Sequence, residues 1–230
     1  MKGSIERTEF ARFSAKFDDR VRRLVVTSEG GSEFQALRIG EVLAQRGVDV
    51  YVLGYCMSAC ANFIFVAGRQ RMLIGDAAVG YHGSEISAMR DEARLRADLE
   101  ASLPPEGVVW KLAWTRRLFE RGEALYQRQG ASTRILDLSA CIMAQRRKHW
   151  KTFKGDEETG STTVNSGSTS SAWLPSRAQF EAHGITVREA DSHSVAALRL
   201  PSSARKVSRD AVDLRDAVHG EADFPAACQG

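Results

Sequence analysis

Residues 50–68 read VYVLGYCMSACANFIFVAG. The first four of them, Val50 to Leu53, are apolar or β-branched and predict a buried strand. A tight segment follows, and the small apolar residues from Ala59 to Ala67 predict a buried helix that Gly68 ends. A strand that passes through a tight turn into a helix is half of a βαβ unit, and Ser58 lies in that turn.

The alternation of strands and helices continues on both sides of this unit. Upstream, Arg23 to Thr27 predicts a buried strand, and apolar residues at helical spacing then predict an amphipathic helix that Gly47 closes. Downstream, Met72 to Ile74 and Ala78 to Tyr81 predict two more short strands. Such alternation implies right-handed crossovers, so the expected fold class is α/β with a mainly parallel sheet.

The second half of the chain changes character. We expect an α/β domain over residues 1–196, with a helical insertion at about 86–150 and a Gly/Ser/Thr-rich flexible loop at about 155–171. A short helix closed at His183-Gly184 and a strand at Ile185 to Val187 follow the loop. Residues 197–230 are polar and weakly periodic, and they predict a flexible tail.

The helical insertion contains three helical patterns, at residues 86–103, 108–129 and 133–147, the first two separated by Pro104-Pro105. In the second pattern four large apolar residues lie close to one helical face. These are Trp110, Trp114, Leu118 and Leu125. Such a stripe is typical of a core or a subunit interface, and it predicts a homo-oligomer.

Composition excludes several classes of protein. The chain has 230 residues, of which 43% are hydrophobic and 27% charged, as in an ordinary globular protein. The net charge is only +3 and no Lys/Arg run carries interleaved aromatics, so no nucleic-acid partner is expected. No stretch of about 18 apolar residues exists, so no membrane span is expected. The first ten residues lack the basic and apolar regions of an export signal.

The four cysteines are too few for a disulfide scaffold. Cys56 and Cys60 are spaced CxxxC without a matching Cys or His pair, so we expect no metal site. We interpret these two residues as small buried side chains in preference to a disulfide. The others are Cys141 and Cys228.

Ser58 is the strongest candidate for a catalytic residue. It follows a buried strand and precedes a helix of small residues, which places it at the carboxyl edge of the sheet, where α/β folds hold their sites. The amides that follow lie at a helix N-terminus and can stabilise an oxyanion. The alternative is a serine that only caps the helix.

His82 could supply the base that a serine nucleophile needs. It follows the apolar run that ends at Tyr81 and precedes Gly83, so it lies at a strand end one strand after Ser58. The alternative is a capping or packing histidine. Gly30-Gly31 follows the first strand and could present bare N–H groups to a ligand, or could simply form a turn. The pair matches neither GxxxxGK[ST] nor GxGxxG, and no cofactor is expected.

Together these segments resemble the proteolytic subunits of Clp protease, within the crotonase superfamily. Ser28-Glu29-Gly30-Gly31 is similar to their S-P-G-G segment, Cys56 to Cys60 to their nucleophile turn, and Gly80 to Gly83 to their histidine strand. Residues 174–185 are similar to their F-M-S-A-E-E-A-x-E-Y-G-L segment. The C-x-S-A-C turn in particular resembles bacterial Clp-like proteins that are predicted to be periplasmic.

The resemblance implies a fold and a set of roles. The fold would be the Clp/crotonase spiral of βαβ units. Ser58 would attack an acyl carbon, His82 would take its proton, and the N–H groups of Gly31 (or Gly30) and Ala59 would hold the oxyanion. Partners would be a peptide or small acyl substrate and further copies of the chain. The location would be periplasmic if an upstream segment is missing and cytoplasmic otherwise; export would make a Cys56–Cys60 disulfide plausible.

Two positions depart from the family pattern. The triad aspartate should precede the F-M-S-like segment, but residues 170–173 read SSAW and hold no carboxylate. Asp137, Asp156 or Glu85 could substitute, and a hydroxyl such as that of Ser171 could orient His82 weakly. Glu29 also stands where proline is usual.

The leading prediction is a serine hydrolase of the peptidase type that uses a Ser58–His82 dyad and a backbone oxyanion hole. The alternative is a catalytically impaired Clp-like module for binding or assembly, which the missing aspartate and Glu29 favour. A coenzyme-A-type crotonase enzyme is a third class. Those enzymes use oxyanion amides without a Ser–His pair, so the presence of both residues argues against it.

Overall fold

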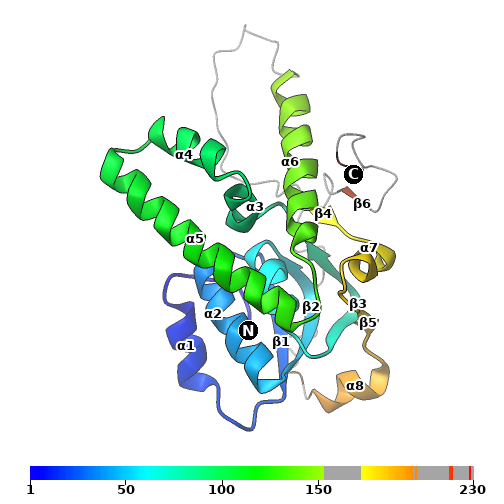
Figure 1. Cartoon of the computed structure of the whole chain (residues 1–230). Helices are drawn as coiled ribbons and strands as arrows, with labels where there is room; N and C mark the ends of the chain where they lie inside the picture. The colour runs from blue at the N-terminus through cyan, green and yellow to red at the C-terminus, as the bar shows by residue number, and fades with distance from the viewer. Residues whose placement is uncertain (153–171, 199, 201–217, 220–227, 229–230) are drawn as a thin grey trace, which may run out of the picture.

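The centre of the molecule is a parallel sheet. A computed structural model describes residues 1–152, 172–198, 200, 218–219 and 228. Within them the sheet has the strand order β1-β2-β3-β5, and each neighbouring pair is parallel (Figure 1). The strands are β1 (Arg23–Ser28), β2 (Asp49–Met57), β3 (Arg71–Gly80) and β5 (Arg188–Glu189). The predicted α/β class with a mainly parallel sheet is confirmed.

The first crossover follows the pattern in the sequence. Helix α2 (Glu33–Arg46) connects β1 to β2, and it ends at Gly47, which adopts the left-handed conformation with φ 61°. Its apolar face is buried, and a Cβ on Gly40 would lie 2.4 Å from the carbonyl oxygen of Phe63. Only glycine lets α2 approach the next helix this closely.

The segment after Ser58 forms the predicted buried helix, but with an unusual geometry. Residues Cys60–Phe65 make a π-helix, η1, and all of them are buried. A π-helical turn is wider than an α-helical one and occurs frequently at functional sites. The expected position of the helix is therefore confirmed, while its hydrogen-bond pattern was not predictable from the apolar composition.

The prediction of two separate strands at 72–74 and 78–81 was wrong. Both belong to β3, which contains an irregularity at Gly75 (φ 64°). Leu53 of β2 pairs with Ile74, and Tyr55 pairs with Ala78, so β3 has two extra residues over this interval. A bulge of this kind lets the strand continue past residues of low strand propensity, here Gly75 and Asp76.

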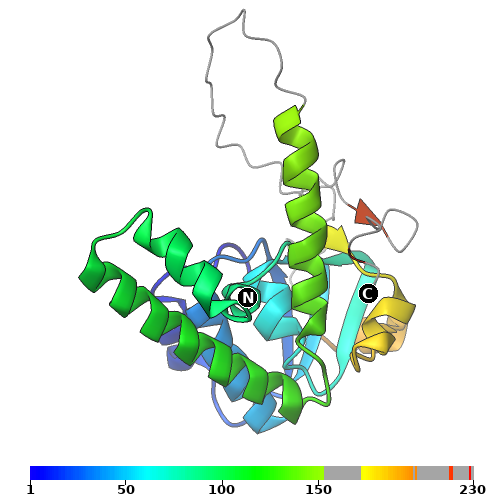
Figure 2. The ribbon, with the colours of Figure 1, turned by 45° about the horizontal axis from the view of Figure 1, so that its top comes forward.

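The helical insertion extends away from the sheet. In Figures 1 and 2, α4 and the amino-terminal half of α5 form a hairpin that projects to one side, while the carboxyl-terminal end of α5 packs on α2 and η1. Burial follows this arrangement, because Leu118 and Leu125 are fully buried whereas Trp110 is 65% exposed. The helices are α3 (Glu85–Met89), α4 (Glu92–Glu100), α5 (Pro105–Arg128) and α6 (Arg134–Thr152).

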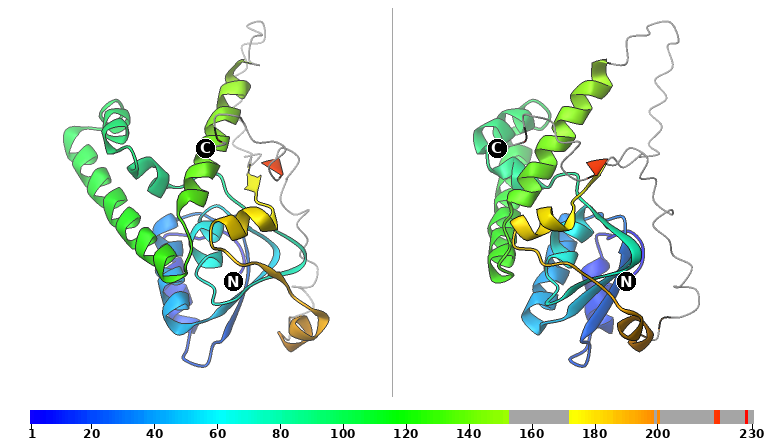
Figure 3. Two further views of the ribbon diagram at one scale, coloured as in Figure 1. Left: turned by 45° about the vertical axis from the view of Figure 1, so that its right-hand side comes forward. Right: turned by 90° about the vertical axis from the view of Figure 1, so that its right-hand side faces the viewer.

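Short elements complete the two ends of the chain. Helix α7 lies against the sheet and α8 at its outer edge (Figure 3), and Phe180 of α7 packs on the rings of Phe65 and Tyr81. Ile185 and Val187, expected to form a strand, are buried, but the strand β5 starts at Arg188, three residues after the predicted start. The elements are α1 (Glu9–Lys16), β4 (Trp173–Leu174), α7 (Arg177–Ala182), α8 (Ser192–Ala197) and β6 (Val218–His219).

All four cysteines form disulfides, Cys56–Cys60 and Cys141–Cys228. The expectation of unbonded buried thiols at Cys56 and Cys60 was therefore wrong: both are buried, and the turn between them brings their Cα atoms to 5.3 Å.

The predicted loop at 155–171 and most of the predicted tail at 197–230 lie outside the described residues. Two described points of that tail contact the domain, since β6 pairs with β4 and Cys228 is bonded to α6. Among the described residues, we find no helix with the length and hydrophobicity that a membrane span requires.

Candidate active site

Ser58 lies in a strained turn at the carboxyl end of β2. Its φ is 56°, and it is the sole non-glycine residue with a positive φ in the described chain. Its N–H donates to the carbonyl oxygen of Gly80 (2.9 Å), and its own carbonyl oxygen accepts from Asn62 N–H (2.8 Å). The left-handed conformation costs a residue with a side chain about 1–2 kcal/mol. Such strain persists only where surrounding contacts hold it, and it is concentrated at functional sites.

The Gly30-Gly31 loop lies directly on this turn. A Cβ on Gly30 would be 2.6 Å from both Ser58 Cβ and the Met57 carbonyl oxygen, and 3.0 Å from Ala59 N. The two segments are 27 positions apart in the sequence, yet their backbones are in contact. Glycine at position 30 is thus required both by φ (96°) and by space.

The two glycines differ in what their N–H groups do. Gly30 N–H donates to Ser28 Oγ at 3.1 Å, so it is already occupied. Gly31 is exposed, and the groups that bond to Ile5 are the neighbouring Gly30 carbonyl and Ser32 N–H. Among the described residues the Gly31 N–H has no acceptor. Of the two glycines predicted as donors, Gly31 is the one whose N–H has no acceptor among the described residues.

His82 follows the end of β3 at the same edge of the sheet. Gly80, the last residue of that strand, pairs with Met57 and accepts the Ser58 N–H. Tyr81 is buried and exchanges two backbone hydrogen bonds with Trp173 (2.9 and 2.7 Å), which fixes the chain just before His82. His82 itself is exposed. The three predicted segments therefore meet at the carboxyl edge, as parallel strands require.

Sequence reasoning missed a carboxylate that joins these segments. Glu33, in the first turn of α2, accepts from Asn62 Nδ2 (3.2 Å), from Ser84 Oγ (3.0 Å) and from Glu85 N–H (3.1 Å). Asn62 Nδ2 also donates to the Gly83 carbonyl oxygen at 3.2 Å. Burial raises the pKa of Glu33 to about 7, against the lowering effect of its hydrogen-bond donors. Asn62 was the available signal, because it is a polar residue inside an apolar helix.

We name Glu33, Asn62 and Ser84 the Glu33 network. It links α2, which follows the glycine loop, to η1, which follows Ser58, and to the segment that follows His82. Asn62 Oδ1 is buried without a partner among the described residues. A partly buried network of this kind favours one arrangement of the segments that it joins.

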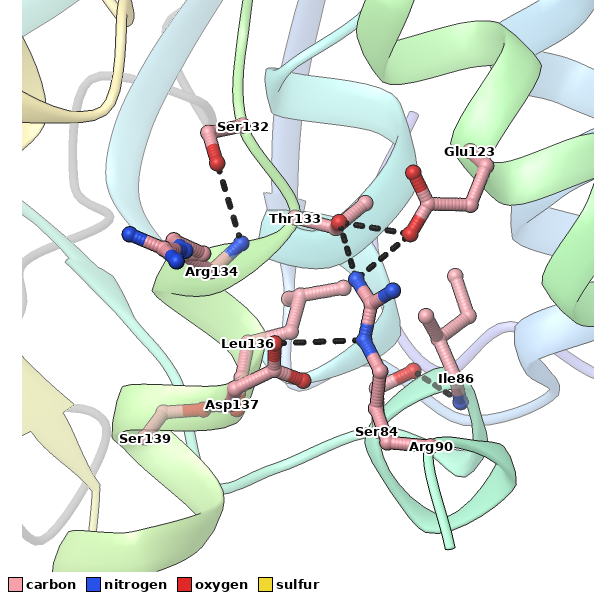
Figure 4. Close-up of polar contacts among 10 residues, drawn as sticks. All are labelled: Ser84, Ile86, Arg90, Glu123, Ser132, Thr133, Arg134, Leu136, Asp137 and Ser139. Carbon is pink, nitrogen blue, oxygen red and sulfur yellow. Dashed lines mark hydrogen bonds and ion pairs between the residues drawn. The ribbon is translucent and has the colours of Figure 1, made fainter. Parts of the chain in front are cut away.

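Of the proposed orienting groups, Asp137 is held in an ion pair (Figure 4). Its Oδ2 lies 3.3 Å from Arg90 Nε, and Arg90 also contacts Glu123 (2.5 Å) and Thr133 Oγ1 (2.6 Å). Asp137 Oδ1 is buried and has no partner in the described part of the chain. A Cβ on Gly83 would lie 3.5 Å from Ala140, so the helix that carries Asp137 packs on the residue after His82.

Of the other orienting candidates, one is held by other partners and two lie outside the described residues. Glu85 pairs with Lys111 Nζ at 2.7 Å and accepts from Thr115 Oγ1 at 3.3 Å. Asp156 and Ser171 lie outside the described residues. Glu29, the second departure from the family pattern, is exposed, so its charge is solvated. No cluster of three His, Cys, Asp or Glu residues suited to a metal ion occurs among the described residues.

Comparison with known proteins adds a partial structural similarity. No protein-family model matches the chain, and no curated protein matches it. Among solved structures, a mutant ClpP1 from Listeria monocytogenes aligns with a TM-score of 0.38 and 16% sequence identity, over 56% of this chain and 70% of that one. Because this overlap is limited, the function proposed below rests on the residues of the chain itself.

Proposed function

We propose that the chain is a serine hydrolase that acts on a peptide or a small acyl substrate. Ser58 is the nucleophile, His82 is the general base, and the N–H groups of Gly31 and Ala59 bind the oxyanion. The observation that carries the proposal is the contact of the Gly30-Gly31 loop with the strained Ser58 turn. A serine that served only as a helix cap would need neither the left-handed backbone nor the glycine loop packed on it.

The proposed reaction follows from these positions. His82 takes the proton from the Ser58 hydroxyl as the oxygen attacks the acyl carbon, and it returns the proton to the leaving group. The oxyanion that forms accepts hydrogen bonds from Gly31 N–H, which is free, and from Ala59 N–H at the start of the helical segment. Water then releases the acyl group by the reverse sequence of proton transfers.

For the group that orients His82, we propose Asp137. Its buried Oδ1 has no partner among the described residues, and α6 packs against Gly83. Its ion pair with Arg90 would hold the other oxygen and the side-chain conformation. A carboxylate behind the histidine fixes the tautomer and stabilises the imidazolium, and its loss costs about 10⁴ in rate in a complete triad.

The test is labelling by a fluorophosphonate probe. The native protein should be labelled, Ser58→Ala should not be, and His82→Ala should react at least about 10²-fold more slowly because it lacks the base. Asp137→Asn should slow labelling, whereas Glu123→Gln, which also contacts Arg90, should not. A folded native protein that takes up no label would overturn the proposal.

A second candidate function is a non-catalytic module for binding or assembly. The specific observation in its favour is that both described carboxylate candidates, Asp137 and Glu85, are already in ion pairs. This alternative predicts that a folded native protein is inert to the probe, and that Ser58→Ala leaves any self-association unchanged.

The two disulfides are relevant to the cellular compartment of the protein. All four cysteines are paired, and disulfides persist in oxidising environments such as the bacterial periplasm. We propose such a compartment for this chain. Mass spectrometry of protein purified under thiol-blocking conditions should show both disulfides in material from the periplasmic fraction; free thiols in all native material would contradict the proposal.

A further inference from the structure

A cavity lies at the opposite end of the sheet from Ser58. Its volume is about 430 Å³, and it is lined by residues that include Arg69, Arg71, Gln129, Thr186 and Arg188. Arg71 pairs with Val50 at the start of β2, and Ser58 follows the end of that strand. At about 3.3 Å per residue the two sites are roughly 25 Å apart. The cavity therefore belongs to a different part of the fold from the proposed active site.

The cavity contains a buried arginine that has no carboxylate partner. Arg71 is only 6% exposed. Its Nε and Nη2 donate to the Val66 carbonyl oxygen (3.0 and 2.8 Å), and Nη2 also donates to Gln129 Oε1 (3.2 Å). All of these acceptors are neutral, and burial lowers the pKa of Arg71. A buried charge is normally paired, so an uncompensated one indicates a missing negative partner.

The other side chains at the cavity do not supply that partner. None of its lining residues is Asp or Glu. Arg69 forms a double hydrogen bond with Asp49 (2.8 and 2.9 Å), which neutralises it. Arg188 is exposed and has no ion pair among the described residues. The cavity thus combines two uncompensated positive charges with the neutral polar groups of Gln129 and Thr186.

We propose that this cavity binds a small molecule through a phosphate or carboxylate group, with Arg71 and Arg188 as its charge partners. Guanidinium groups bind both kinds of oxyanion through paired N–H donors. The volume exceeds that of a single inorganic oxyanion, so the ligand carries further atoms beside Gln129 and Thr186.

The experiment measures binding of inorganic phosphate and of acetate to the full chain by calorimetry and thermal shift. Sodium chloride holds the ionic strength constant, because surface charge effects depend on salt. We expect saturable binding of at least one of the two anions, and which one binds identifies the chemistry of the group. If neither binds, or chloride raises the melting temperature equally, the proposal is overturned.

Variants connect the binding to the cavity. Arg188→Gln removes an exposed charge without opening the core and should weaken binding about tenfold, the loss of one charge-assisted contact. Arg71→Gln should abolish binding; if it fails to fold, Arg188→Gln decides. Arg117→Gln, an exposed arginine on α5 outside the cavity, is the matched control and should bind like the native chain. Equal affinity of Arg188→Gln and the native chain would contradict the proposed site.

Discussion

Gly30 packs directly on Ser58, because a Cβ added at Gly30 would lie only 2.6 Å from the Cβ of Ser58. The glycine loop, which follows β1, and the proposed nucleophile turn, which follows β2, are therefore closely packed on each other. Changes at either residue should therefore affect the other.

Gly30→Ala should disrupt this packing. The added methyl group meets backbone atoms at 2.6 Å and occupies a positive φ, so we expect a loss of about 3 kcal/mol in unfolding free energy and loss of probe labelling at Ser58. Gly3→Ala is the matched control, since Gly3 has nearly the same φ (100°) but nothing within 4 Å of an added Cβ. It should lose only about 1–2 kcal/mol, measured by urea unfolding. Equal losses of unfolding free energy in Gly30→Ala and Gly3→Ala would show that the contact between Gly30 and the Ser58 turn does not contribute to stability.

Ser58→Gly should distinguish the backbone strain at position 58 from the role of the serine hydroxyl group. Glycine adopts a φ of 56° without a Cβ penalty, so this variant should be about 1 kcal/mol more stable than Ser58→Ala. Both variants lack the hydroxyl and should take up no probe. Urea unfolding of the two proteins side by side is the measurement; a less stable Ser58→Gly would mean that the turn is not strained.

The two disulfides should have different effects when removed. On the chain-entropy model, removing Cys141–Cys228, which closes 87 positions, costs about 4.6 kcal/mol, and removing Cys56–Cys60, which closes four, costs about 2 kcal/mol. Only the Cys56–Cys60 disulfide flanks Ser58, so the Cys56→Ala/Cys60→Ala variant should react with the probe about tenfold more slowly, or slower still. The Cys141→Ala/Cys228→Ala protein serves as the control. Unchanged labelling without Cys56–Cys60 would rule out a role of that disulfide in positioning Ser58.

Glu33 should make stability depend on pH. Its folded-state pKa of about 7 lies above the ordinary value of 4.5, so the folded chain holds the proton more tightly than the unfolded chain. The contribution of Glu33 to the free energy of unfolding is fully present below about pH 4.5. It falls by on the order of 3 kcal/mol as the pH rises through 7. Glu33→Gln should flatten that slope between pH 5 and 7.5, and Glu106→Gln, an exposed control, should retain it. Identical slopes for native and Glu33→Gln proteins would exclude this assignment.

Trp110→Ser should weaken self-association, if the projecting hairpin is the interface of the predicted homo-oligomer. Trp110 and Val109 are each 65% exposed and Leu103 is 39% exposed, and exposed apolar clusters mark interaction surfaces. Light scattering should show native oligomers and smaller species for Trp110→Ser. Arg117→Ser on the same helix should leave the mass unchanged. A native monomer at working concentration would contradict the predicted oligomer.

Local sequence pattern was sufficient to predict the parallel α/β framework. Three local signals act over a few positions and correspond to elements of the predicted type: the apolar runs at 23–27 and 50–53, the helical spacing before Gly47, and the small residues after Ser58. The order of these elements also required that Ser58, Gly30-Gly31 and His82 come to one edge of the sheet, because parallel strands end together.

Other features depended on contacts between segments far apart in the chain. The bulge that joins two predicted strands into β3 arises from pairing with β2, and the choice of Gly31 over Gly30 as free donor arises from the position of Ser28 Oγ and Ile5. The Glu33 network, the Arg90–Asp137 pair and the buried charge of Arg71 each join separate elements. The sequence by itself determined which residues reach the sheet edge, because that depends on local propensity and strand order. Only the tertiary structure decided their hydrogen-bond partners and charges, because those depend on burial and on neighbours that no local spacing specifies.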